Sequence, residues 1–200
     1  MKEDFEWIRS WTDLSNNEDL PRILLIGDSI TEGYQELVRN GLKGVCYVDY
    51  IATSYPVNRT MYQNLITSIA NDSTYDLIHF NHGLHGFEMS LEDYKAYINK
   101  VISSFRCKSI IMVTSTRVNL PNTYDEDLKW GKVLKDRNMF IKTYALENNF
   151  ILDDLFELSQ KIENKDRLTD GFHYQRSGYE ILANQVVKSV KMALAKSLTK

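Results

Sequence analysis

The chain has 200 residues, of which 43% are apolar and 26% are charged, and its formal net charge is -3. This length is typical of one domain, and the apolar fraction excludes a wholly disordered chain. The small negative charge argues against nucleic acid as the main partner.

The beginning of the chain has neither the apolar stretch nor the small-residue cleavage site of a signal peptide. No apolar run approaches the ~18–20 residues that cross a bilayer. We therefore expect a cytoplasmic protein without membrane contact. Its two cysteines, Cys46 and Cys107, lie in apolar runs and are expected to be reduced thiols of the core.

Short apolar runs alternate with longer amphipathic segments along the chain. Residues 1–21 are expected to form a helical extension with Trp7 and Trp11, outside a single domain over 22–200. Apolar runs predict five strands in that domain, at 22–27, 45–51, 76–81, 108–114 and 150–153.

Helical spacing occurs between these runs. Ser90 and Asp93 resemble a capping box at the start of one helix, and another helix begins near Gln175. Residues 116–128 have no period and predict a long loop. The alternation indicates a doubly wound α/β domain, a three-layer sandwich around a five-stranded parallel sheet. Such sheets bind ligands beyond the carboxyl ends of their strands.

The first candidate for chemistry is Gly27-Asp28-Ser29, directly after the strand at 22–27. This position places the Ser29 hydroxyl at a helix N-terminus, where free N–H groups favour developing negative charge. A nucleophilic serine and its oxyanion need such an environment. The alternative is that Asp28 or Ser29 only caps the following helix.

The second candidate is Asp170-Gly171-Phe172-His173, just before the last helix. In a tight loop, the Asp170 carboxylate can accept from the imidazole N–H of His173 and fix its tautomer. The other ring nitrogen is then able to take a proton from a serine. The alternative is a surface turn in which both residues are merely polar.

The third candidate is the histidine cluster at the end of the strand at 76–81. Alternation places His79 and Asn81 on one face of that strand and Ile78 and Phe80 on the other, and His79 is expected to be a packing histidine. His82 and His85 fall on the loop beyond the carboxyl end, where a ligand is expected. The sequence allows His82 to lie either in the wall of a pocket or at the surface.

Together, these segments make the chain resemble the SGNH, or GDSL-type, hydrolase family of esterases and lipases. Gly27-Asp28-Ser29 matches the nucleophile block of that family, and Asp170 with His173 matches its last block. The resemblance covers about 22 to 195. It implies a flavodoxin-like fold, no cofactor, a small-molecule ester as the substrate, and a triad of Ser29, His173 and Asp170.

The chain departs from the other two blocks of the family. Where the family has Gly-x-Asn-Asp, this chain reads Gly83-Leu84-His85-Gly86, so His85 stands at the position of the oxyanion-binding asparagine. The second block has no glycine here. The resemblance then implies an oxyanion hole made of the N–H of Ser29, an N–H near Ser54, and the ring of His85.

Four further residues are expected to border the substrate: Asp28, His82, Gly83 and Arg117. Arg117 follows the strand at 108–114, and it either binds an acidic or polyhydroxylated group or makes a surface salt bridge. The chain shows no lid of bulky apolar residues, so we expect a short acyl group, such as acetyl on a carbohydrate.

Two other functions remain open on these residues. In one, His82, His85 and His173 bind a metal together with Asp28 and Asp170, and the chain is a metal-dependent hydrolase. In the other, the altered blocks mark a catalytically degenerate module that only binds carbohydrate. A nucleotide-binding protein is disfavoured because the chain has neither glycine-rich phosphate motif.

Overall fold

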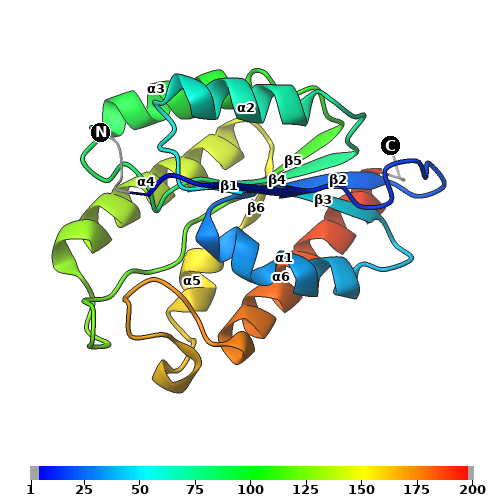
Figure 1. Ribbon diagram of the computed structural model, residues 1–200. Coiled ribbons are helices and arrows are strands. Elements are labelled where there is room, and N and C mark those ends of the chain that lie inside the picture. The colour runs from blue at the N-terminus through cyan, green and yellow to red at the C-terminus, as the bar shows by residue number, and fades with distance from the viewer. Residues whose placement is uncertain (1–4, 198–200) are drawn as a thin grey trace.

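The computed structural model describes residues 5–197, and its centre is one six-stranded sheet with the strand order β1-β3-β2-β4-β5-β6 (Figure 1). The last five strands in the chain are parallel to one another, and β1 pairs antiparallel to β3. The strands are β1 (Ile8–Trp11), β2 (Arg22–Gly27), β3 (Tyr47–Thr53), β4 (Leu77–Asn81), β5 (Ser109–Val113) and β6 (Ile151–Asp153).

All five strands expected from the apolar runs are present. β2 is buried over its whole length because it is central in the sheet and covered on both faces. The order β3-β2-β4-β5-β6 is that of a flavodoxin-like sheet, with the change of winding direction between β2 and β4. The carboxyl ends of β2, β3 and β4 therefore lie side by side.

The expectation of a helical extension over 1–21 is wrong for residues 5–21, which contain β1 and no helix. β1 is an edge strand whose four residues are all exposed. Its main chain pairs with β3, while Arg9 forms an ion pair with Glu32 and Trp11 lies under Arg39 of the neighbouring helix. An edge strand held in this way has no apolar periodicity, so its sequence does not predict it. With β1, the sheet has six strands and not the expected five.

Helices cover both faces of the sheet and complete three layers. In Figure 1, α2 and α3 lie on one face, and α1 and α6 lie on the other. The helices are α1 (Ser29–Gly41), α2 (Thr60–Ala70), α3 (Leu91–Ile102), α4 (Leu128–Glu147), α5 (Leu155–Ser159), a short 3₁₀ turn (Asn164–Asp166) and α6 (Arg176–Ser197). Each face has its own apolar core: Leu24 belongs to one and its neighbour Leu25 to the other.

Several local expectations are confirmed. Ser90 caps α3 by accepting from the N–H of Asp93, as the capping pattern predicts. Both cysteines are free; Cys46 is buried, and burial raises the pKa of its thiol to about 12, whereas Cys107 is only half-buried. Within residues 5–197, no helix combines the length and apolar character that a membrane crossing requires.

Candidate active site

Ser29 is the first residue of α1, directly beyond the carboxyl end of β2. Asp28 is the N-cap, and its side chain accepts from the N–H of Ile30 at 3.0 Å. Gly27 is needed at this junction, because a Cβ there would come within 2.0 Å of the Thr31 hydroxyl. The Gly-Asp-Ser segment thus turns the chain sharply from strand to helix and leaves the N–H of Ser29 without an acceptor inside the helix.

The structure brings Ser29, His173 and Asp170 into one hydrogen-bonded series. The Ser29 Oγ lies 2.7 Å from Nε2 of His173, and Nδ1 of His173 lies 2.7 Å from Oδ2 of Asp170. An ionised carboxylate can only accept, so Nδ1 carries the hydrogen and Nε2 accepts from the serine hydroxyl. The side chains of His173 and Asp170 are 34% and 44% exposed, so solvent reaches this series.

The second oxygen of Asp170 fixes the loop that carries His173. Asp170 Oδ1 accepts from the main-chain N–H groups of Phe172 and His173, both at 2.9 Å. Partial burial opposes ionisation of Asp170, but these N–H groups and the His173 ring lower its pKa below the ordinary value. The carboxylate is therefore ionised at neutral pH and keeps the His173 ring oriented.

The loop at 116–127 is hydrogen-bonded to the loop that carries His173. The N–H of Asn119 donates to the carbonyl of Gly171 at 2.9 Å, and the N–H of Asn122 donates to the carbonyl of Thr169. Gly171 has φ +91°, and a Cβ there would lie 2.4 Å from the Asn119 carbonyl oxygen. The predicted loop over 116–128 is confirmed up to residue 127, because α4 begins at Leu128.

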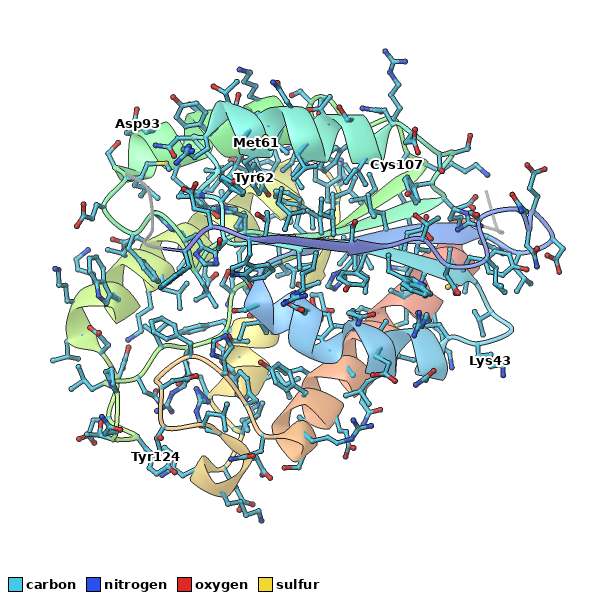
Figure 2. The ribbon with its side chains drawn as sticks, in the orientation of Figure 1. Lys43, Met61, Tyr62, Asp93, Cys107 and Tyr124 are labelled. Carbon is cyan, nitrogen blue, oxygen red and sulfur yellow. The ribbon has the colours of Figure 1, made fainter. Side chains whose placement is uncertain are left out.

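The guanidinium of Arg117 is hydrogen-bonded within this same loop. Its Nε donates to Asn119 Oδ1 at 2.8 Å, and its Nη2 donates to the carbonyl of Tyr124 at 2.9 Å. Tyr124 lies at the outer end of the loop (Figure 2). Among residues 5–197, Arg117 has no carboxylate partner, and its guanidinium instead holds the two sides of the loop together. Its contact with a substrate group stays a prediction.

Ser54 cannot supply the expected main-chain donor of the second block. Its N–H donates to the carbonyl of Trp7 at 3.2 Å, and its hydroxyl accepts from the N–H of Trp7 at 2.9 Å. The N–H of Tyr55 is bound to the Thr53 hydroxyl, and Pro56 has no N–H. The prediction for Ser54 is wrong because Trp7, in the chain just before β1, already accepts from its N–H. A helix predicted over residues 1–21 gave no reason to expect this hydrogen bond.

Two members of the histidine cluster, His79 and His82, are buried and make different contacts. His79 is fully buried, and its Nε2 lies 3.2 Å from Asp153 Oδ2, which confirms its packing role. His82 is only 5% exposed and packs between Tyr62 and Tyr94, so it is not a surface residue. Tyr62 lies between α2 and the sheet (Figure 2). Burial and the charge of Arg137 lower the pKa of His82 to about 3.

Asp28, His82 and Gly83 are all buried, and their expected contact with the substrate stays a prediction. Gly83 is a packing position, where a Cβ would come within 2.0 Å of the Ser115 hydroxyl. His85 is half-buried on the loop after β4, the strand that pairs with β2. Its part in an oxyanion hole stays a prediction.

The metal hypothesis gains no support from the described part of the chain. Among residues 5–197, no three His, Cys, Asp or Glu side chains are grouped so that they could hold a metal ion. His82 points its ring into an aromatic environment, and His173 is engaged with Asp170 and Ser29.

Arg137 is not among the residues predicted from the sequence, yet it is 1% exposed and binds the carbonyls of the loop at 83–86. A signal for it was present. Leu134 and Ile141 mark the inner side of α4, and Arg137 falls between them at spacings of three and four, on the same side of the helix. A charged residue within an apolar stripe indicates a buried charge.

Known structures share this fold, whereas no family model and no curated protein matches the chain. A GDSL-like lipase from Bacteroides thetaiotaomicron VPI-5482 superposes with TM-score 0.66 at 15% identity, over 86% of this chain and 88% of that chain. The chain thus has the fold of the SGNH/GDSL hydrolases.

Two further structures show the same likeness. An acetyl xylan esterase from Geobacillus stearothermophilus has TM-score 0.67 at 17% identity, covering 85% of this chain and 94% of that one. The C-terminal catalytic domain of peptidoglycan O-acetyltransferase A from Streptococcus pneumoniae has TM-score 0.69 at 14% identity, covering 88% and 96%. At these identities the likeness establishes the fold.

Proposed function

We propose that this protein is a serine esterase with Ser29 as nucleophile, His173 as general base and Asp170 as the residue that orients His173. The observation that carries the proposal is the pair of 2.7 Å contacts from Ser29 to His173 and from His173 to Asp170. They lie at the carboxyl edge of the sheet, where α/β folds place their ligands.

The reaction follows from these contacts. The Ser29 Oγ attacks the ester carbonyl while Nε2 of His173 takes its proton, and a tetrahedral oxyanion forms. As the intermediate collapses, His173 gives this proton to the departing alcohol, and the acyl group stays on Ser29. A water then attacks the acyl-enzyme with His173 again as base, which releases the acid and restores the Ser29 hydroxyl.

The oxyanion would be held by the main-chain N–H of Ser29 and by the side chain of His85. The N–H of Ser29 belongs to the first turn of α1, where the helix leaves its donors free and favours negative charge. Because Ser54 is occupied by Trp7, more of this task falls on His85 than the family resemblance implies.

For the substrate, we infer a short acyl ester, with acetyl on a carbohydrate as the first candidate. Two of the structures that share the fold bear names that refer to acetyl groups on polysaccharides. A series of p-nitrophenyl esters of increasing acyl length, followed by acetylated sugars, tests this inference. A preference for acyl chains of eight or more carbons would contradict it.

The esterase proposal itself is tested with purified wild type, Ser29→Ala and His173→Ala on p-nitrophenyl acetate. We expect both variants to lose at least about 10³-fold in kcat. Ser90→Ala is the matched control, because Ser90 is also a serine at a helix start, and it should cost only about 1 kcal/mol of stability. Equal rates for wild type and Ser29→Ala would refute the proposal.

A binding module without catalysis is the remaining alternative. A fluorophosphonate probe separates the two, since it forms a covalent bond only with an activated serine. Labelling of wild type but not of Ser29→Ala supports the esterase. Absence of labelling, together with binding of acetylated oligosaccharide, would favour the module.

A further inference from the structure

Arg137 is a buried cation that holds the loop at 83–86. Its Nη1 donates to the carbonyls of Gly83 and His85, both at 2.9 Å, and its Nη2 donates to the carbonyl of Gly86 at 2.5 Å. The side chain comes from the middle of α4 and crosses to the carboxyl end of β4. Three carbonyls of a loop without regular secondary structure thus converge on one guanidinium.

Aromatic rings complete the environment of this charge. The guanidinium carbon of Arg137 lies 4.5 Å from the ring centre of Tyr94 and 5.5 Å from that of Phe87. Within residues 5–197, no carboxylate forms an ion pair with it. Burying a charge that only carbonyls and aromatic faces stabilise is costly, so the arrangement demands a reason beyond packing.

The loop itself needs an external support. Gly86 has φ +63°, and a Cβ at that residue would lie 2.8 Å from the side chain of Pro56. The chain therefore passes close to the neighbouring loop in a left-handed conformation. Arg137 binds the carbonyl of His85 itself, and the carbonyls of Gly83 and Gly86 on either side of it along the loop.

We propose that Arg137 is a positioning residue, which fixes the main chain around His85 so that the His85 ring stays in the oxyanion hole. The proposal rests on the esterase function above and extends it to a residue outside the reacting groups. A planar guanidinium binds several carbonyls at fixed angles, which an ammonium cannot reproduce.

The chain offers a matched control in Arg22. This arginine is also buried, donates to the carbonyls of Asp13, Leu14 and Asn17, and lies 5.0 Å from the ring centre of Tyr47. It differs in having an ion pair with Asp49. Arg22 begins β2, so it lies at the opposite end of that strand from Ser29.

The test compares Arg137→Lys with Arg22→Lys, with Arg137→Gln as a second variant. We expect Arg137→Lys to lower kcat on p-nitrophenyl acetate about 10- to 100-fold with KM nearly unchanged, because a misplacement of about 1 Å costs rate and not binding. Arg22→Lys should keep the wild-type kcat. Equal kcat for the two lysine variants would overturn the proposal.

Two more measurements locate the effect. If Arg137 acts through His85, Arg137→Lys should change kcat little in a His85→Ala background, whereas additive losses would contradict this. Hydrogen exchange of peptides covering 82–90 should be faster in Arg137→Lys and Arg137→Gln but not in Arg22→Lys. Unchanged hydrogen exchange over 82–90 in the Arg137 variants would overturn the positioning role, whatever the activity of the wild type. Absence of Ser29-dependent hydrolysis in the wild type would refute the esterase function separately.

Discussion

The tetrahedral intermediate of the proposed esterase reaction needs hydrogen-bond donors, and the residues around Ser29 determine which ones are available. The N–H of Ser54 is bound to Trp7, so the side chain of His85 is the proposed donor that a substitution can test directly. We expect His85→Ala to lower kcat about 10²- to 10³-fold, and His85→Asn to recover part of this loss, since an amide N–H can replace the ring N–H. Steady-state kinetics decide; wild-type turnover in His85→Ala would exclude the role.

His82 gives a second prediction, on stability. Its folded pKa of about 3 lies below the ordinary 6.5, so below pH 6.5 the unfolded chain binds a proton that the folded chain does not. The free energy of unfolding should therefore fall as pH drops from about 6.5 towards 3, by up to about 1.4 kcal/mol per pH unit. Urea titrations at several pH values measure this slope.

His82→Phe is the matching variant for that experiment, because it keeps an aromatic ring between Tyr62 and Tyr94 and removes the titrating nitrogens. The difference in unfolding free energy between wild type and His82→Phe should shrink or reverse as the pH falls. Parallel pH profiles for the two proteins would show that His82 titrates normally.

The residues that the sequence could predict were those with a motif. Gly27-Asp28-Ser29 and Asp170-x-x-His173 carry their chemistry in fixed local geometry, so their order along the chain was informative. The roles of Ser54 and Arg137 depend on partners 47 and more than 50 residues away. Local sequence can mark Arg137 as a buried charge, but it does not identify the distant groups that Ser54 and Arg137 bind.

At the scale of elements, the loop at 116–127 is coupled to the loop that carries His173. Gly171→Ala should push these two apart, because the added Cβ meets the Asn119 carbonyl and the residue is at φ +91°. We expect kcat to fall about 10- to 100-fold with a small change in KM, as His173 moves from Ser29.

Gly44→Ala is the control for this prediction. Gly44 also has positive φ, at +77°, and it lies between α1 and β3. A Cβ added to Gly44 would meet no atom of residues 5–197 within 4 Å. Both variants should lose about 1–2 kcal/mol of stability from the left-handed conformation. Only Gly171→Ala should lose activity; similar kcat values in the two would show that the contact with Asn119 does not position the base.

The same scale explains which elements the sequence predicted. Four of the five parallel strands, β2 to β5, are buried along nearly their whole length, so their apolar runs were distinct. β1 was missed because its side chains are exposed and its stability comes from main-chain pairing with β3 and from contacts of Arg9 and Trp11 with α1. Pairing of this kind depends on the partner strand, which lies about 40 residues further along the chain.

At the scale of the whole molecule, one sheet separates two apolar cores and joins them. Leu24 and Leu25 are adjacent in β2, both have no exposed surface, and they face opposite cores. Leu24→Ala and Leu25→Ala should each lower the free energy of unfolding by about 2–5 kcal/mol. Because β2 belongs to both cores, each variant should still unfold in a single transition, which circular dichroism in urea would detect; two separate transitions in either would show independent halves.

The proposed site depends on this cooperativity. Ser29 and His173 are 144 residues apart in the sequence, and they come from elements at the two ends of the domain. α1 and α6 pack on the same face of the sheet, so the 2.7 Å contact exists only when that layer is assembled. Esterase activity should therefore disappear at the same urea concentration as the circular dichroism signal, in wild type and in both leucine variants. Loss of activity at a clearly lower urea concentration would mean that the loops at 116–127 and 168–173 open before the domain unfolds.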